Sequence, residues 1–215
     1  MGSKQLQQSI RITPRLVMAC IIAILPGCGG PTAVEVPPIQ PDEAAQGVLK
    51  QYDTNGDGQL TLEELASCPG IRDAIARYDK DGNQQISAAE LSKRFAMWVD
   101  GGVGVTTLTC NVMFNGKPLD GAQVQLIPEA FLADAIEPAI GVTDQSGFAI
   151  LAIDTAHLPD DMKNLRGVVH QGVFRVEITH PSIDIPTKYN SQTTLGQEVS
   201  ADTGENFIRW KLTGK

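Results

Sequence analysis

The chain divides into regions that differ in how apolar and polar residues alternate. Over residues 41–99 apolar side chains recur at helical spacing, whereas over 103–215 they alternate with polar ones between turns rich in Gly, Asn and Asp. Residues 28–40 are rich in proline and show neither period, which is typical of an extended tether. We therefore expect an α + β protein with two separate domains, a helical one and a β-sandwich, joined by the glycine-rich segment 100–104.

Residues 1–27 have the pattern of a secretory signal peptide. Three basic side chains precede an apolar run over residues 16–25, which is too short to span a hydrocarbon core of ~30 Å as a helix. The run ends in LPGC, which resembles the lipobox of bacterial lipoproteins. This resemblance implies cleavage before Cys28, a lipid anchor on that residue, and a membrane-anchored location in the bacterial cell envelope, facing the periplasm or the exterior. An ordinary secretory signal or an uncleaved anchor are the alternatives.

A first cluster of oxygen-bearing side chains occupies the twelve residues DTNGDGQLTLEE, residues 53–64. Oxygen ligands stand at the first, third, fifth, seventh, ninth and twelfth places, so that the loop can curl round one ion: Asp53, Asn55, Asp57, Gln59, Thr61 and Glu64. Gly58 is sixth, where the chain turns sharply, and Leu60 is eighth. This is the pattern of an EF-hand calcium loop, in which the seventh residue binds through its carbonyl and the twelfth through both carboxylate oxygens.

The residues flanking this loop support the prediction. Ala45, Val48 and Tyr52 recur at helical spacing before it. After it, TLEE is a capping box, and we expect Leu62, Leu65 and Ala66 to continue an apolar stripe up to a proline.

A second copy, DKDGNQQISAAE, follows 26 residues later over residues 79–90. The corresponding ligands are Asp79, Asp81, Asn83, Gln85, Ser87 and Glu90. We expect its eighth residue, Ile86, to pair with Leu60. The sixth residue is Gln84, and a left-handed backbone there costs roughly 1–2 kcal/mol. Because ~1.4 kcal/mol corresponds to a tenfold change in an equilibrium constant, we expect the second site to bind calcium about tenfold more weakly.

The second region predicts about seven short strands. Alternation is clear in TLTCNVMF, AQVQLIP, GVFRVEITH and NFIRWKL, with two more strands around the turn in GVTDQSGFAILAI and a weaker one near residues 195–199. This count suits an Ig-like sandwich. The elements GKPL, GA-V and TD--G-F resemble carboxypeptidase-regulatory-like, transthyretin-type domains of bacterial lipoproteins. The resemblance implies a non-catalytic spacer or interaction module.

Charge and cysteine content narrow the possible functions. After removal of the signal, 14 basic and 25 acidic side chains give a net charge of −11, which argues against nucleic acid as a partner. Cys68 and Cys110 would remain, and we expect two free thiols rather than a disulfide, because Cys110 lies on the apolar face of a strand. No pattern typical of a zinc peptidase, a nucleophile elbow or a phosphate loop occurs, so we do not expect an enzyme.

We therefore expect a lipid-anchored envelope protein that binds two calcium ions, mainly for stability, and that has an unknown protein partner. A calcium-dependent docking module similar to dockerins is one alternative. An enzyme with a site formed between the two domains is another.

Overall fold

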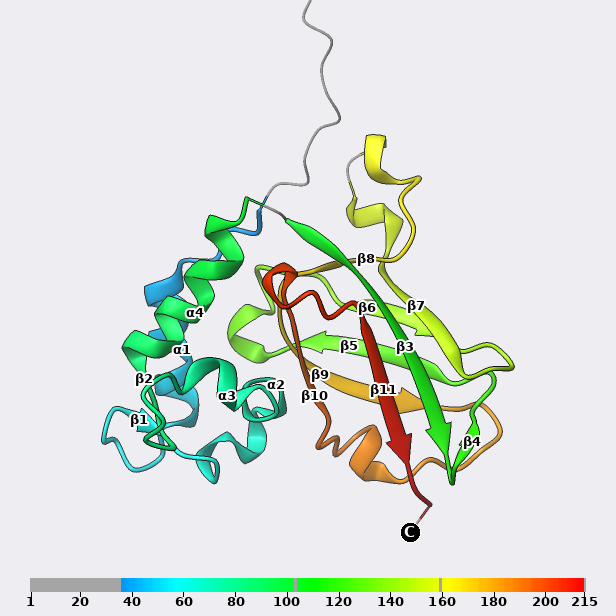
Figure 1. The fold of residues 1–215 in the computed structure, drawn as a ribbon, viewed down its shortest axis with the longest axis horizontal. Helices are drawn as coiled ribbons and strands as arrows, with labels where there is room; N and C mark the ends of the chain where they lie inside the picture. The colour runs from blue at the N-terminus through cyan, green and yellow to red at the C-terminus, as the bar shows by residue number, and fades with distance from the viewer. Residues whose placement is uncertain (1–35, 103, 159, 215) are drawn as a thin grey trace, which may run out of the picture. The chain divides into compact units, whose positions relative to one another are not determined.

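Helices occupy the first part of the described chain and strands the rest (Figure 1). The computed structural model describes residues 36–102, 104–158 and 160–214. The α-helices are α1 (Pro41–Tyr52), α2 (Pro69–Arg72), α3 (Ile75–Tyr78) and α4 (Ala88–Asp100). The strands are β1 (Gln59–Leu60), β2 (Ile86–Ser87), β3 (Val105–Phe114), β4 (Lys117–Pro118), β5 (Gln123–Pro128), β6 (Ala139–Val142), β7 (Phe148–Ile153), β8 (Val168–His170), β9 (Gly172–Thr179), β10 (Gly196–Val199) and β11 (Phe207–Leu212). The 3₁₀ turns are η1 (Glu64–Ser67), η2 (Ala130–Leu132), η3 (Thr155–His157), η4 (Asp160–Met162), η5 (Thr187–Tyr189) and η6 (Ala201–Thr203).

The two longer helices, α1 and α4, begin at local signals. Pro41 starts α1, where its missing N–H costs nothing. Ser87 caps α4 in a complete capping box with Glu90. Each helix turns an apolar stripe inward, and the fully buried residues include Val48 on α1 and Phe95 on α4.

Nine of the described strands form one curled sheet (Figure 1). Their order is β10-β9-β5-β6-β7-β3-β11, with β4 and β8 also paired to β3. The pairs are antiparallel except for β3 and β11, which run parallel. All seven predicted segments are strands, and β4 and β8 are two short additional ones. The chain is thus α + β, with a small helical region before a large, mainly antiparallel sheet.

The helical region and the sheet share a hydrophobic core within one compact unit. Trp98 of α4 and Phe174 of β9 belong to the same buried cluster. The backbones of α2 and β10 lie so close that a Cβ on Gly196 would come within 1.9 Å of the Pro69 carbonyl oxygen. The two regions predicted as separate domains are therefore packed against each other.

Both cysteines of the described residues lie in this core. Cys68 precedes α2, and Cys110 lies on β3 beside the buried Leu108 and Val112. Both thiols are free and fully buried.

Candidate metal centre

The first loop, residues 53–64, is ordered by hydrogen bonds from backbone N–H groups to its own acidic and amide side chains. The Asp53 carboxylate accepts from the N–H groups of Gly56 and Gly58 at 2.7 and 2.9 Å. The Asn55 side chain accepts from the Asp57 N–H at 2.8 Å, and Asp57 accepts from the Gln59 N–H at the same distance. The side chains at the first, third and fifth places are therefore held toward the inside of the turn.

Glu64 closes this loop. Its Oε2 accepts from the Thr61 N–H at 2.9 Å and from the Thr61 hydroxyl at 3.0 Å, while Oε1 accepts from the Thr54 N–H at 3.0 Å. These hydrogen bonds, that from the Thr61 backbone first, lower the pKa of Glu64 from 4.5 to about 2. The carboxylate is therefore ionised at any physiological pH, as a metal ligand must be.

The second loop, residues 79–90, repeats this arrangement. Asp79 accepts from the N–H groups of Gly82 and Gln84 at 2.8 and 2.9 Å, and Asn83 accepts from the Gln85 N–H at 2.7 Å. Glu90, in the first turn of α4, accepts from the Ser87 N–H and hydroxyl at 2.9 and 2.8 Å. Partial burial acts to raise the pKa of Glu90, but the hydrogen bonds from Ser87 and from the backbones of Lys80 and Asp81 together outweigh it and leave the pKa below its ordinary value.

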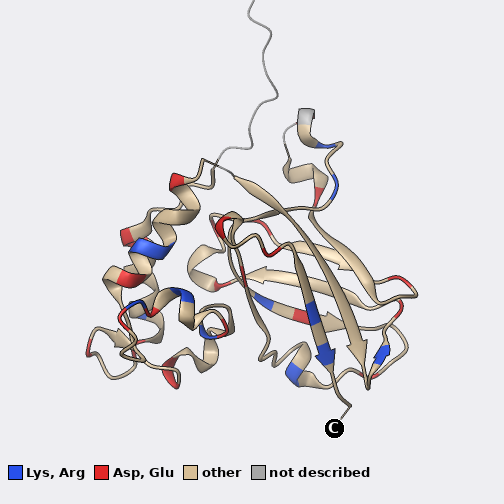
Figure 2. Ribbon diagram, in the orientation of Figure 1, with Lys and Arg blue, Asp and Glu red and all other residues tan. Residues whose placement is uncertain are grey.

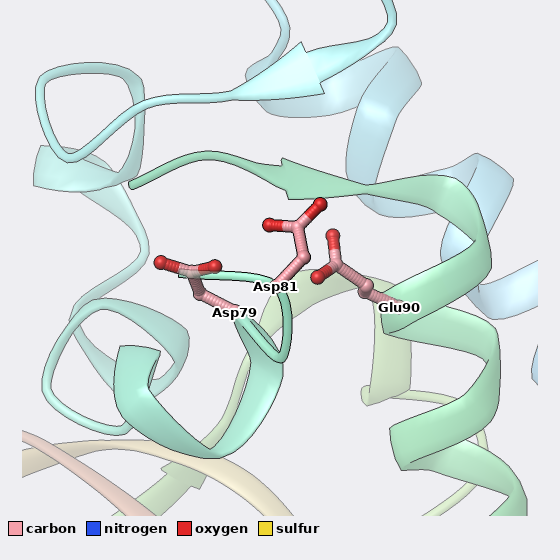
Figure 3. A group of neighbouring side chains, drawn as sticks. All are labelled: Asp79, Asp81 and Glu90. Atoms are coloured by element: carbon pink, nitrogen blue, oxygen red, sulfur yellow. The ribbon is translucent and has the colours of Figure 1, made fainter. Parts of the chain in front are cut away.

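Three carboxylates of the second loop converge. Asp79, Asp81 and Glu90 each place one oxygen within 4.8 Å of the others (Figure 3). No other described residues bring three His, Cys, Asp or Glu side chains together in this way. In the first loop an amide, Asn55, stands at the place corresponding to Asp81.

The two loops are joined back to back by a short antiparallel ribbon. β1 pairs with β2 so that Leu60 lies opposite Ile86 and Gln59 opposite Ser87. Leu60 and Ile86 are both fully buried. The predicted pairing of the eighth residues is thereby confirmed.

The sixth residue of each loop has a left-handed backbone, as predicted. Gly58 has a φ of 79° and Gln84 a φ of 68°. Glycine adopts this conformation without strain, whereas in Gln84 it brings the Cβ too close to the following carbonyl oxygen. The difference between the two loops that the sequence indicates is therefore present in the backbone.

The flanking segments differ from the prediction in two places. The first loop is followed only by the 3₁₀ turn η1, so Leu65 is buried but Leu62 is 50% exposed and Ala66 is also exposed. The predicted apolar stripe over these residues is wrong, because a 3₁₀ turn of four residues brings only one of them onto the core. The helix that enters the second loop is divided into α2 and α3.

The donor set of both loops suits a hard divalent cation. Carboxylate, amide and carbonyl oxygens are the ligands that calcium prefers, and neither loop contains a His or Cys. Acidic residues occur in both loops, and also on the helices and in turns of the sheet (Figure 2). A bound cation would offset the mutual repulsion of the three carboxylates that converge in the second loop.

Several buried charged residues around the helices could not be predicted from the sequence. Glu129, Glu198 and Arg94 are each at most 4% exposed. Glu198 lies in the short strand β10, and the partners of its side chain come from residues 100 or more positions away, such as Arg94. No local pattern could have identified them.

The predicted signal peptide, the lipidation at Cys28 and most of the tether lie outside the described residues. Among the described residues, no helix is both long enough and apolar enough to cross a membrane.

The comparisons with known proteins identify one motif. The EF-hand family model matches residues 45–69, which cover most of α1, the first loop and η1. This match shows an EF-hand motif and suggests calcium binding. No curated protein shows significant similarity to the chain.

Among solved structures, the chain is similar to a DUF3823 family protein from Parabacteroides merdae. The identity is 12% and the TM-score 0.30, over 51% of this chain and 45% of that one. The match thus spans less than half of that protein's length.

Proposed function

We propose that this protein binds two calcium ions, one in each of the loops 53–64 and 79–90, and that the ions stabilise the fold. The observation that carries the proposal is the convergence of Asp79, Asp81 and Glu90 within 4.8 Å, in a loop paired with one that matches the EF-hand family. Three carboxylates so close repel one another, and calcium binding relieves that repulsion.

A stabilising role fits the packing of the helices better than a switching role. α2 packs against the sheet, where the Asp73 carboxylate accepts from the Gly196 N–H at 3.0 Å and the Arg72 guanidinium donates to the Thr194 carbonyl. A helix held in this way has little freedom to move when an ion binds. Calcium at ~100 times its dissociation constant would add ~2.7 kcal/mol per site to the free energy of unfolding.

Calcium titration by calorimetry, on the full chain purified in mild detergent, tests the proposal. We expect two sites in the range of extracellular EF modules, ~10⁻⁴–10⁻³ M, the second about tenfold weaker. Glu64→Gln should remove the first site and Glu90→Gln the second, whereas Glu63→Gln, at an exposed position beside a ligand, should change neither. Absence of calcium uptake by the wild-type protein at millimolar concentrations would refute the proposal.

We further propose that the protein is a non-catalytic lipoprotein of the bacterial cell envelope, anchored through Cys28. The LPGC motif after an apolar run supports the anchor, and the resemblance to carboxypeptidase-regulatory-like domains supports an Ig-like or transthyretin-like interaction module. The intact mass of the purified protein tests the first point: it should correspond to a chain that begins at Cys28 and carries acyl groups. A chain with a free Cys28 thiol would contradict it.

Calcium-dependent docking of a protein partner is the second candidate. It is favoured by apolar side chains exposed on the helical region, Leu62 at 50% and Met97 at 44%. Pull-downs with calcium and with a chelator distinguish docking from a purely stabilising role. Partner binding that needs calcium and is lost in Leu62→Ser supports docking. Partner binding that changes neither with calcium nor with Leu62→Ser contradicts it.

A further inference from the structure

A single buried carboxylate of the sheet contacts both helices that flank the second loop. Glu198 of β10 has a fully buried side chain. Its oxygens accept from Arg94 Nε at 2.7 Å, Arg77 Nη1 at 3.0 Å, Trp98 Nε1 at 3.2 Å and the Tyr78 hydroxyl at 3.4 Å. We call these five residues the Glu198 hub.

The donors of the hub lie next to the ligands of the second loop. Tyr78 is the last residue of α3 and directly precedes Asp79, the first ligand. Arg94 lies on α4 one turn beyond Glu90, the last ligand. Glu198 therefore holds the entering and the exiting segment at a set distance from each other, and that distance decides whether the first and twelfth ligands meet.

Burial makes this arrangement rigid. Arg94 is 4% exposed and also donates to the Asp202 carboxylate at 2.8 and 3.2 Å, so its orientation is set by two acids. A buried charge that loses its partner is strongly unfavourable, so the helices cannot move apart without breaking a costly contact. By contrast, the Arg77–Glu205 pair lies at the surface, where Glu205 is 58% exposed, and surface pairs contribute little.

No described hydrogen bond or ion pair joins Glu198 to α1, to η1 or to the first loop. The first loop instead follows Tyr52 of α1, which packs near Cys68 and Glu129. A change at Glu198 should therefore act on the second loop and leave the first largely unaffected.

We propose that Glu198 is a positioning residue for the second calcium loop. It acts through Tyr78 and Arg94, and it keeps Asp79 and Glu90 close enough to share one ion despite the strained backbone at Gln84. This role rests on the proposed calcium binding. Since coupling between two sites is reciprocal, calcium in the second loop also strengthens the packing of α3 and α4 on β10.

The test compares Glu198→Gln with Glu205→Gln in the full chain, by calcium calorimetry well below the melting temperature. Both changes replace a carboxylate that faces Arg77, one buried and one exposed. We expect Glu198→Gln to lower the affinity of the second site by roughly 5- to 150-fold, the usual range of coupling, and to leave the first site within about twofold. Glu205→Gln should change neither site by more than about twofold.

Hydrogen exchange in a chelator separates positioning from a general loss of stability. In Glu198→Gln we expect faster exchange at Gly82 and Gln84, whose N–H groups bond to Asp79, with no change at Gly56 and Gly58 of the first loop. Equal acceleration in both loops would show a merely structural role and would overturn the proposal.

A milder variant keeps the proposal testable if Glu198→Gln does not fold. Trp98→Phe removes one donor of the hub and leaves every charge in place. It should weaken the second site in the same direction and by a smaller factor. Unchanged second-site affinity in the variants that fold would overturn the positioning role alone, whereas a wild-type protein without calcium uptake would overturn the proposed function and this role with it.

Discussion

The buried carboxyl group of Glu129 should make the stability of this protein fall as the pH rises from 4.5 to about 7. Glu129 follows β5 and is 1% exposed, and its Oε1 accepts from the Gly70 N–H of α2 at 3.0 Å. Burial is the main cause that raises its pKa from 4.5 to about 7, against the lowering effects of the Gly70 N–H and of Arg175. Burial also raises the pKa of the neighbouring Cys68 thiol and Tyr52 hydroxyl, so both stay neutral in this range.

The magnitude follows from the two pKa values. Each pH unit between 4.5 and about 7 corresponds to ~1.4 kcal/mol, so ionisation of Glu129 costs the folded state about 3 kcal/mol. In that window the folded protein binds more protons than the unfolded chain, and the free energy of unfolding therefore decreases as the pH rises. The loss begins above the unfolded value of 4.5 and is complete above about pH 7.

Urea denaturation at a series of pH values between 4.5 and 8, with a chelator present, measures this effect. Glu129→Gln keeps a hydrogen-bond acceptor for Gly70 and cannot ionise, so its stability should exceed that of the wild type by an amount that grows with pH. Glu63→Gln, at an exposed position, serves as the control. Burial lowers the pKa of His170 and acts in the opposite sense, but His170 is present in every variant and cancels in the comparison. Parallel stability curves for wild type and Glu129→Gln would refute the reasoning.

Two further substitutions test the backbone of the second loop and the packing of α2. Gln84→Gly relieves ~1–2 kcal/mol of strain at a φ of 68° and loses ~0.5–1 kcal/mol of chain entropy. We therefore expect the free energy of unfolding or the calcium affinity of the second site to rise, by up to ~1.5 kcal/mol or about tenfold. A decrease in both would contradict this. Gly196→Ala places a Cβ within 1.9 Å of the Pro69 carbonyl oxygen, so it should lower the free energy of unfolding, measured by urea denaturation, by ~3 kcal/mol or more. Gly101→Ala is the control: the nearest atom to its added Cβ is at 3.6 Å, and it should change the free energy of unfolding by less than ~0.5 kcal/mol.

Local features of loops 53–64 and 79–90 could be predicted from the sequence because their interactions are between residues a few positions apart. The left-handed backbone at Gln84 and the capping box of Ser87 and Glu90 each involve residues a few positions apart. Most strands could be predicted equally well, since alternation of apolar and polar residues over a short segment is enough to indicate a strand. The short β8 was missed because three residues carry too little pattern to stand out.

The sequence alone was enough to predict the oxygen-bearing side chains of the two loops, their spacing and the positions of the main strands, because all of these depend on neighbours along the chain. Three features emerged only from long-range packing: the helices lie directly on the sheet, Leu62 faces solvent, and Glu129 and Glu198 are buried. Burial of a charge depends on its partners, and those of Glu198 lie on α3 and α4, about 100 residues or more away in the chain. A periodic pattern shows which face of an element is apolar, but it does not show which other element covers that face.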